Sequence, residues 1–100
     1  MAVECVNESS GKTVYKFDMR MNTTKCFEAE KKIICNIEVG NEIVFDLIGV
    51  EYISSSFLRL CGKAMYKVNT ENFSIINVTP SVKKVFKIVG LDQKLNLLER

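Results

Sequence analysis

Three consecutive serines, Ser54, Ser55 and Ser56, stand where an apolar, strand-like segment passes into a helix-like one. The first turn of a helix exposes unpaired N–H groups and carries partial positive charge, so it favours anionic groups. A serine there can cap the helix, carry a phosphate or contact a partner. Capping alone is a sufficient role for serines at such a junction. No other segment looks as much like a functional site.

The composition lacks the residues and motifs that catalytic and metal-binding sites usually need. The chain has no histidine, and its 4 cysteines are scattered without a C-x-x-C pair. A serine without an activating base is a poor nucleophile, and the chain has neither a G-x-S-x-G elbow nor a phosphate-binding glycine loop. We therefore expect no enzyme activity, no cofactor and no metal. The cysteines are expected to be reduced thiols packed as small hydrophobes.

The length and composition indicate a single domain over residues 1–100. Hydrophobic residues make up 47% and charged residues 26% of the chain, which is ordinary for a globular protein. No apolar run is long enough to span a bilayer, and the first residues do not resemble a signal peptide. The sequence therefore predicts a cytoplasmic protein without membrane insertion.

The charge is uneven along the chain. Residues 1–56 hold 6 basic and 9 acidic side chains (net −3), whereas residues 57–100 hold 8 basic and 3 acidic ones (net +5). The lysines of the basic half alternate with apolar residues at helical spacing, which is typical of the solvent side of an amphipathic helix. We therefore expect no direct contact with nucleic acid.

The first half of the chain reads as a hairpin, a helix and a strand. Residues 3–6 and 13–19 are predicted strands joined by a turn, with Tyr15, Phe17 and Met19 facing the core. Asn22 is a predicted cap for a helix over residues 23–37. Its expected apolar stripe consists of Cys26, Ala29, Ile33 and Ile37, widened by Phe27 and Ile34.

A nearly continuous apolar run over residues 43–48 predicts a central strand covered on both faces. Asp46 interrupts this run. We interpret it as a hydrogen-bonded carboxylate at the end of the strand, because a lone buried carboxylate is rare.

The second half of the chain alternates strands and helices. Residues 52–53 lead into a helix that begins at the serines and carries an apolar stripe, and residues 73–78 form the next predicted strand. Thr79 and Pro80 form a strong helix start, followed by the stripe Val82, Val85, Phe86, Val89 and by Gly90 just past the end. Residues 95–98 are either a last short strand or a loose tail. The order predicts an α/β fold: a small single-domain mixed β-sheet covered by three or more helices.

Two segments resemble the STAS domains, and in particular the anti-sigma factor antagonists among them. F-D-L-I-G-V-E-Y-I-S-S-S is similar to the family pattern D-L-S-G-V-x-x-I-D-S-S-G-L, and I-I-N-V-T-P-S-V-K-K-V-F-K-I-V-G-L-D is similar to N-x-S-P-x-V-x-x-x-L-x-x-x-G-L. The resemblance covers most of the chain. It is weak over the first twenty residues.

This resemblance implies a function. Antagonists of this family bind an anti-sigma factor, often a serine kinase of the histidine-kinase ATPase type, and are released when that kinase phosphorylates one serine. The family's acceptor corresponds to Ser56, with Ser55 as the alternative. The implied partner-binding residues are Asn22, Thr23, Ser54, Ser55, Ser56 and Phe57.

Two positions depart from the family pattern. Ser54 stands where the family has aspartate, and Phe57 stands where it has glycine. A glycine permits close approach by a partner, which phenylalanine does not. Phe57 is thus either an exposed interface anchor or a core residue. These changes leave room for a second function, in which the chain is a non-phosphorylated STAS-like docking subunit of a transporter ATPase or a signalling assembly.

Overall fold

The computed structural model describes residues 3–7, 12–37, 40–90 and 96–99. They form strands, three α-helices and a short 3₁₀ helix, in the order β1 (Val3–Asn7), β2 (Lys12–Phe17), β3 (Arg20–Met21), α1 (Thr23–Ile34), β4 (Glu42–Asp46), β5 (Tyr52–Ile53), α2 (Ser55–Val68), η1 (Thr70–Asn72), β6 (Phe73–Val78), α3 (Pro80–Ile88) and β7 (Asn96–Glu99).

The main sheet is mixed, as predicted. Its strand order is β1-β2-β4-β6-β7, in which β1 runs antiparallel to β2 and the remaining neighbours are parallel. β1 and β2 pair as the predicted hairpin, although the middle of its turn, residues 8–11, lies outside the described residues. Of the two alternatives left open for residues 95–98, a short strand is present as β7, and residue 95 lies outside the described part. β3 and β5 form a separate two-stranded parallel sheet that the sequence did not predict.

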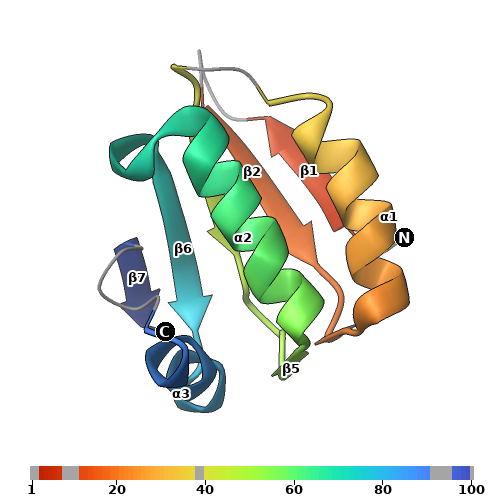
Figure 1. Cartoon of the computed structure of the whole chain (residues 1–100), viewed down its shortest axis with the longest axis vertical. Coiled ribbons are helices and arrows are strands. Elements are labelled where there is room, and N and C mark those ends of the chain that lie inside the picture. The colour runs from red at the N-terminus through yellow and green to blue at the C-terminus, as the bar shows by residue number, and fades with distance from the viewer. Residues whose placement is uncertain (1–2, 8–11, 38–39, 91–95, 100) are drawn as a thin grey trace.

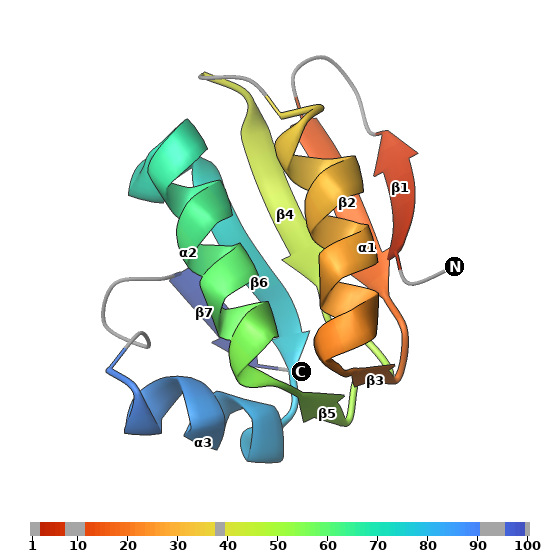
Figure 2. The same cartoon turned by 45° about the vertical axis from the view of Figure 1, so that its right-hand side comes forward.

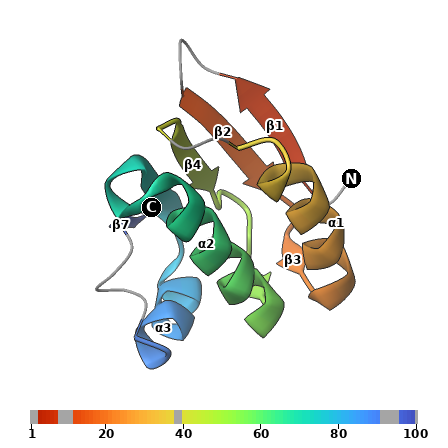
Figure 3. The same cartoon turned by 45° about the horizontal axis from the view of Figure 1, so that its top comes forward.

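The helices do not all cover the same part of the sheet. α1 and α2 lie side by side on one face, while α3 lies at the end of β6, close to β7 (Figures 1 and 2). The view in Figure 3 separates the layer formed by α1 and α2 from the sheet behind it. Because β2, β4 and β6 run parallel, the helices that follow them all begin at the same edge of the sheet.

An aromatic cluster fills the space between this helix pair and the sheet. The Phe45 ring on β4 lies 6.1 Å from that of Tyr15, 4.9 Å from that of Phe17 and 4.8 Å from that of Phe73, in edge-on geometry. Edge-to-face pairs add to the stabilisation that comes from burial alone. The prediction of a central strand agrees with the burial of every residue from Ile43 to Leu47.

Some predicted boundaries and core positions were wrong. α1 ends at Ile34, before the predicted end at residue 37, because its last turn tightens: the N–H of Asn36 bonds to the carbonyl of Ile33, three residues back (3.0 Å). The central strand ends at Asp46, and Ile48 is 48% exposed.

Three side chains predicted to face the core are exposed: Met19 at 55%, Phe27 at 59% and Val89 at 50%. Met19 follows the end of β2, Phe27 lies beside the buried stripe of α1 rather than within it, and Val89 is the C-cap residue of α3.

The start and end of α3 agree with the sequence prediction. The hydroxyl of Thr79 accepts a hydrogen bond from the N–H of Val82 (3.3 Å), and Pro80 is the first helical residue. Gly90 follows the helix with φ +77°, a left-handed conformation that glycine adopts without steric cost.

The cysteines are divided in their exposure. Cys26 and Cys61 are buried as predicted, whereas Cys5 and Cys35 are exposed, which corrects the expectation that all were packed inside. No helix within the described residues has the length and apolar character needed to cross a membrane.

Burial of three acidic side-chain groups makes the folded state less stable at alkaline pH. It raises the pKa of Tyr15 to about 12, with a contribution from Cys5, raises the pKa of the Cys26 thiol, and holds the pKa of the Cys61 thiol well above its ordinary value of 9.0. Above the ordinary pKa values the unfolded chain loses these protons first, so the folded state becomes relatively less stable.

We therefore expect the melting temperature to be insensitive to these groups below about pH 8 and to fall from about pH 9 upward, through the ordinary pKa range of thiols and phenols. Thermal melts followed by circular dichroism between pH 7 and pH 12 check this. In Tyr15→Phe the decline between pH 10 and pH 12 should be shallower, and an unchanged slope would contradict the assignment to Tyr15.

Candidate functional site

The three serines occupy one sheet edge together with the start of α1. We call Asn22, Thr23, Ser54, Ser55 and Ser56 the serine edge. β3 pairs with β5 immediately before these residues, and the N–H of Ser54 donates to the carbonyl of Met21 (3.1 Å). The beginnings of α1 and α2 are therefore held side by side, as the parallel strand order predicted (Figure 2).

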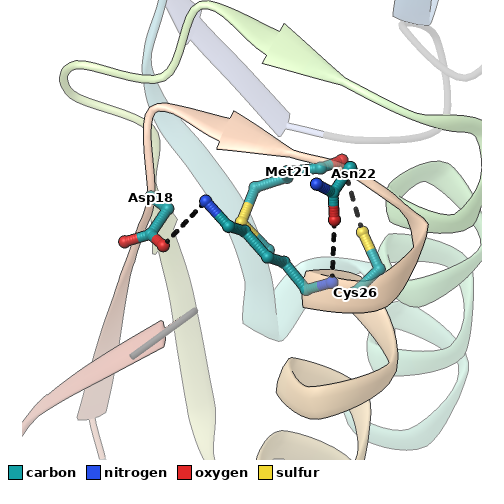
Figure 4. Close-up of polar contacts among 5 residues, drawn as sticks. Asp18, Met21, Asn22 and Cys26 are labelled. Atoms are coloured by element: carbon teal, nitrogen blue, oxygen red, sulfur yellow. Dashed lines mark hydrogen bonds and ion pairs between the residues drawn. The ribbon is translucent and has the colours of Figure 1, made fainter.

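The start of α1 is capped by a side chain. The amide oxygen of Asn22 accepts a hydrogen bond from the N–H of Lys25 (3.0 Å), as predicted for this residue. Lys25 in turn makes an ion pair with Asp18 (3.2 Å), and Figure 4 shows this arrangement beside Cys26. Asn22 and Thr23 are exposed, so they are accessible to a partner.

Ser54 begins α2 through its backbone rather than its side chain. Its carbonyl accepts a hydrogen bond from the N–H of Phe57 (3.0 Å), but its hydroxyl makes no capping bond. The side chain turns inward, where it is 9% exposed and its Oγ lies 3.5 Å from the Sγ of Cys26. Ser54 therefore occupies the N-cap position without being a side-chain cap.

The Cys26 thiol joins the two helix starts. Its Sγ lies 3.6 Å from the carbonyl oxygen of Met21 (Figure 4). Burial raises the pKa of this thiol, so the group is protonated at neutral pH. A thiol has one hydrogen; if it donates to Met21, the hydroxyl of Ser54 donates to the sulfur. Sequence reasoning placed Cys26 in the core stripe of α1 and missed this contact.

The other two serines face outward. Ser55 is exposed and Ser56 is half-buried. Of the three, only Ser54 has a hydroxyl with a hydrogen-bonding partner among the described residues. The first turn of α2 contains no acidic residue, so its N–H groups have no side-chain anion nearby on the helix. Two hydroxyls at the positive end of a helix are thus available to an incoming group.

Phe57 is a core residue, and its interpretation as an exposed interface anchor was wrong. It is 0% exposed, with its ring 5.1 Å from that of Phe17 and 6.2 Å from that of Phe45. It begins the inner stripe of α2, which continues through Leu60, Cys61, Ala64 and Val68. Its side chain is buried in the core and does not contribute to the exposed surface of the serine edge.

Exposed apolar side chains lie next to the serine edge, and the sequence analysis did not identify them. Tyr52 is 42% exposed, with the guanidinium of Arg20 at 4.8 Å from its ring centre, a cation–π distance. Met19 is exposed beside them, and its carbonyl accepts hydrogen bonds from the N–H groups of Glu51 and Tyr52. One sequence feature could have identified this surface. Arg20 and Tyr52 each stand directly before a buried residue in a short segment where polar or exposed and apolar residues alternate.

Asp46 has the structural role that the sequence predicted. Its Oδ1 accepts hydrogen bonds from the N–H of Ile48 (3.0 Å) and from the side-chain amide of Asn77 (2.8 Å), which holds the ends of β4 and β6 together. Asn77 itself has φ +58°. In the part of the chain that the structure describes, no group of three or more cysteine, aspartate or glutamate residues is arranged to hold a metal ion.

Comparisons with known proteins identify the fold. No protein-family profile matches the sequence, and no curated protein matches it. Solved structures do. A STAS-domain anti-sigma factor antagonist from Planctomyces limnophilus has a TM-score of 0.85 at 20% identity, with 98% of this chain and 90% of that chain covered.

Two further structures agree with this one. The anti-sigma factor antagonist SpoIIAA in its unphosphorylated form has a TM-score of 0.79 at 19% identity, covering 96% of this chain and 87% of that one. An anti-sigma factor antagonist from Mycobacterium paratuberculosis has a TM-score of 0.78 at 17% identity, covering 98% and 86%. The chain therefore has the fold of the STAS-domain anti-sigma factor antagonists.

Proposed function

We propose that this chain, which has the STAS fold, is an anti-sigma factor antagonist. In this proposal it binds an anti-sigma factor that is also a serine kinase of the histidine-kinase ATPase type, in the cytoplasm. The kinase transfers a phosphoryl group to the hydroxyl of Ser56, and the phosphorylated antagonist leaves the complex. A phosphatase restores the binding form.

The observation that carries this proposal is the different orientation of the three serines. Ser54, in the position of the family's aspartate, points inward to Cys26 and stabilises the junction, whereas Ser55 and Ser56 remain available. Ser56 corresponds to the family's acceptor. It is also only half-buried, so a kinase can reach it without unfolding α2. Ser55 is the alternative acceptor.

The partner surface in this proposal is the serine edge together with its exposed neighbours. Asn22, Thr23 and Ser55 are exposed and contribute directly. Tyr52 and Arg20 extend the surface with an aromatic ring and a cation, residue types that concentrate in protein interfaces. Ser54 and Phe57 act from inside, by positioning the first turn of α2.

The proposed mechanism uses no catalysis by this chain. The chain has no histidine, so the acceptor serine has no imidazole base of its own, and the kinase must supply both the base and ATP. A phosphate on Ser56 carries about −1.5 to −2 charges at pH 7. A helix N-terminus accommodates that charge. The phosphate therefore acts on the partner by repulsion and by steric bulk, not by unfolding the domain.

A tagged pull-down from native cells tests the proposal. Wild type and Ser56→Asp are compared, with mass spectrometry of the bound proteins and of the peptide that contains Ser54–Ser56. We expect wild type to capture a kinase of the histidine-kinase ATPase type, Ser56→Asp to lose it, and a fraction of the wild-type peptide to carry phosphate on Ser56.

The same experiment distinguishes the alternative function. If the bound protein is a transporter ATPase, or if binding is indifferent to Ser56→Asp and the peptide carries no phosphate, the serines are structural. The chain is then a docking subunit of a larger assembly. The two kinds of ATPase are told apart by their masses.

A further inference from the structure

A second surface lies between α1 and α2, toward their C-terminal ends and away from the serine edge. It is an open groove lined by Ile34 of α1 and by Arg59, Gly62, Lys63, Tyr66 and Lys67 of α2. Both helices begin at the serine edge and run away from it (Figure 2). The groove therefore borders the serine edge only at Arg59, one turn after Ser55, and its other lining residues lie farther along the helices.

The groove has an apolar component that the fold does not use. Tyr66 is 89% exposed, the highest value among the large hydrophobic side chains described as exposed. Ile34, on the other side of the groove, is only partly buried against the core. Tyrosine is enriched among the residues that dominate binding energy at interfaces. Its ring here has an apolar neighbour across the groove and no packing role within the domain.

The groove is also cationic. Arg59, Lys63 and Lys67 recur every four residues, about 6 Å apart along the helix. Lys63 is paired with Glu30 (3.2 Å), and Lys67 donates one hydrogen bond to the carbonyl of Ile34 (2.6 Å). A carbonyl does not neutralise an ammonium group, and neither Arg59 nor Lys67 forms an ion pair with another of the described residues. Two cations in the groove thus retain their charge.

Gly62 in the middle of α2 has no explanation within the domain. Glycine is the least favourable residue in a helix interior after proline. Gly62 does not have positive φ, and a Cβ built on it meets nothing within 4 Å. Neither backbone conformation nor internal packing requires glycine here. Its missing side chain leaves the groove open to close approach by another backbone.

We propose that this groove binds an acidic amphipathic helix of a partner protein. Arg59 and Lys67 are eight residues apart, about 12 Å along α2. Carboxylates spaced two turns apart on the partner helix pair with them, its apolar face covers Tyr66 and Ile34, and its backbone passes over Gly62. Helix-in-groove recognition uses anchors that recur along one face of the bound helix over two turns, and the charge complementarity selects an acidic partner. This inference does not depend on phosphorylation of Ser56.

A phage-displayed library of sixteen-residue amphipathic helices, with one constant apolar face and random residues elsewhere, tests the proposal on the whole protein. We expect the selected peptides to be enriched in Asp and Glu seven or eight residues apart, the spacing that matches Arg59 and Lys67. Binding of the best peptide, measured by fluorescence anisotropy, should weaken at least tenfold in Arg59→Glu and in Tyr66→Ala. Lys84→Glu, an equal charge change on α3, should leave it unchanged. The proposal would be overturned if the selected peptides are neutral or basic, if no peptide is selected, or if neither groove variant affects binding.

Gly62→Ala tests the role of the glycine, because it should change the stability of the domain and the affinity for the peptide in opposite directions. Because alanine is the better helix former, the melting temperature should rise by roughly 2 to 6 °C. Binding of the same peptide should nevertheless weaken at least fivefold, because the added methyl group occupies the floor of the groove. If the melting temperature falls, the fold itself requires the glycine. If the peptide binds the variant with the same affinity as wild type, no partner backbone approaches Gly62. Either of these two results refutes this part of the proposal.

Discussion

Replacement of Phe57 with alanine is expected to lower the free energy of unfolding by about 3 to 5 kcal/mol, the usual cost of removing a buried phenylalanine. The ring is fully buried and contacts the rings of Phe17 and Phe45, so its loss leaves a cavity between α2 and the sheet. For a domain of this size the total stability is about 5 to 15 kcal/mol, so the variant loses a large share of it.

Urea unfolding followed by far-ultraviolet circular dichroism measures this effect. Tyr66→Ala is the matched control, because it removes an aromatic ring from the same helix at a position that is 89% exposed. It should change the stability by no more than about 0.5 kcal/mol. A cost below about 1 kcal/mol for Phe57→Ala would mean that the ring does not fill the core, and the interpretation of Phe57 as an interface residue would return.

Ser56→Asp is expected to weaken binding of the anti-sigma factor about a hundredfold, or roughly 2.7 kcal/mol, without destabilising the antagonist. A carboxylate at a helix N-terminus interacts favourably with the helix dipole, by about 0.3 to 1 kcal/mol. The melting temperature should therefore not fall, and should equal that of wild type or exceed it by up to about 5 °C. Within an interface, by contrast, an added uncompensated charge costs several kcal/mol. Calorimetric titration and thermal melts of the same preparations separate these two effects.

Ser56→Ala is the control for this experiment, since it removes the acceptor hydroxyl without adding charge. It should bind the partner within about threefold of wild type and should no longer accept phosphate from the kinase. A drop of several degrees in the melting temperature of Ser56→Asp would refute the repulsion mechanism, because binding would then be lost through unfolding. If Ser55→Asp weakens binding while Ser56→Asp does not, the acceptor is Ser55.

The sequence carried more information about the elements than about the site. Periodicity predicted the three helices, the antiparallel first pair and the central strand, because a two-residue period and a 3.6-residue period are both visible in one dimension. Local chemistry predicted the caps at Asn22 and Thr79 and the turn at Gly90. β3 was missed because two residues are too few to show a period.

What the sequence determined by itself, then, was the class of fold, its resemblance to the STAS domains, and the position of the serines at a helix start. Only the tertiary structure decided which way each side chain in that turn faces. Ser54 and Phe57 point inward and Ser55 and Ser56 outward because the apolar stripe of α2 must pack on the aromatic rings of the sheet. Three identical residues in a row do not reveal how the helix is rotated about its axis. The contact between Ser54 and Cys26 likewise depends on β3 pairing with β5, which joins segments that are distant in the chain.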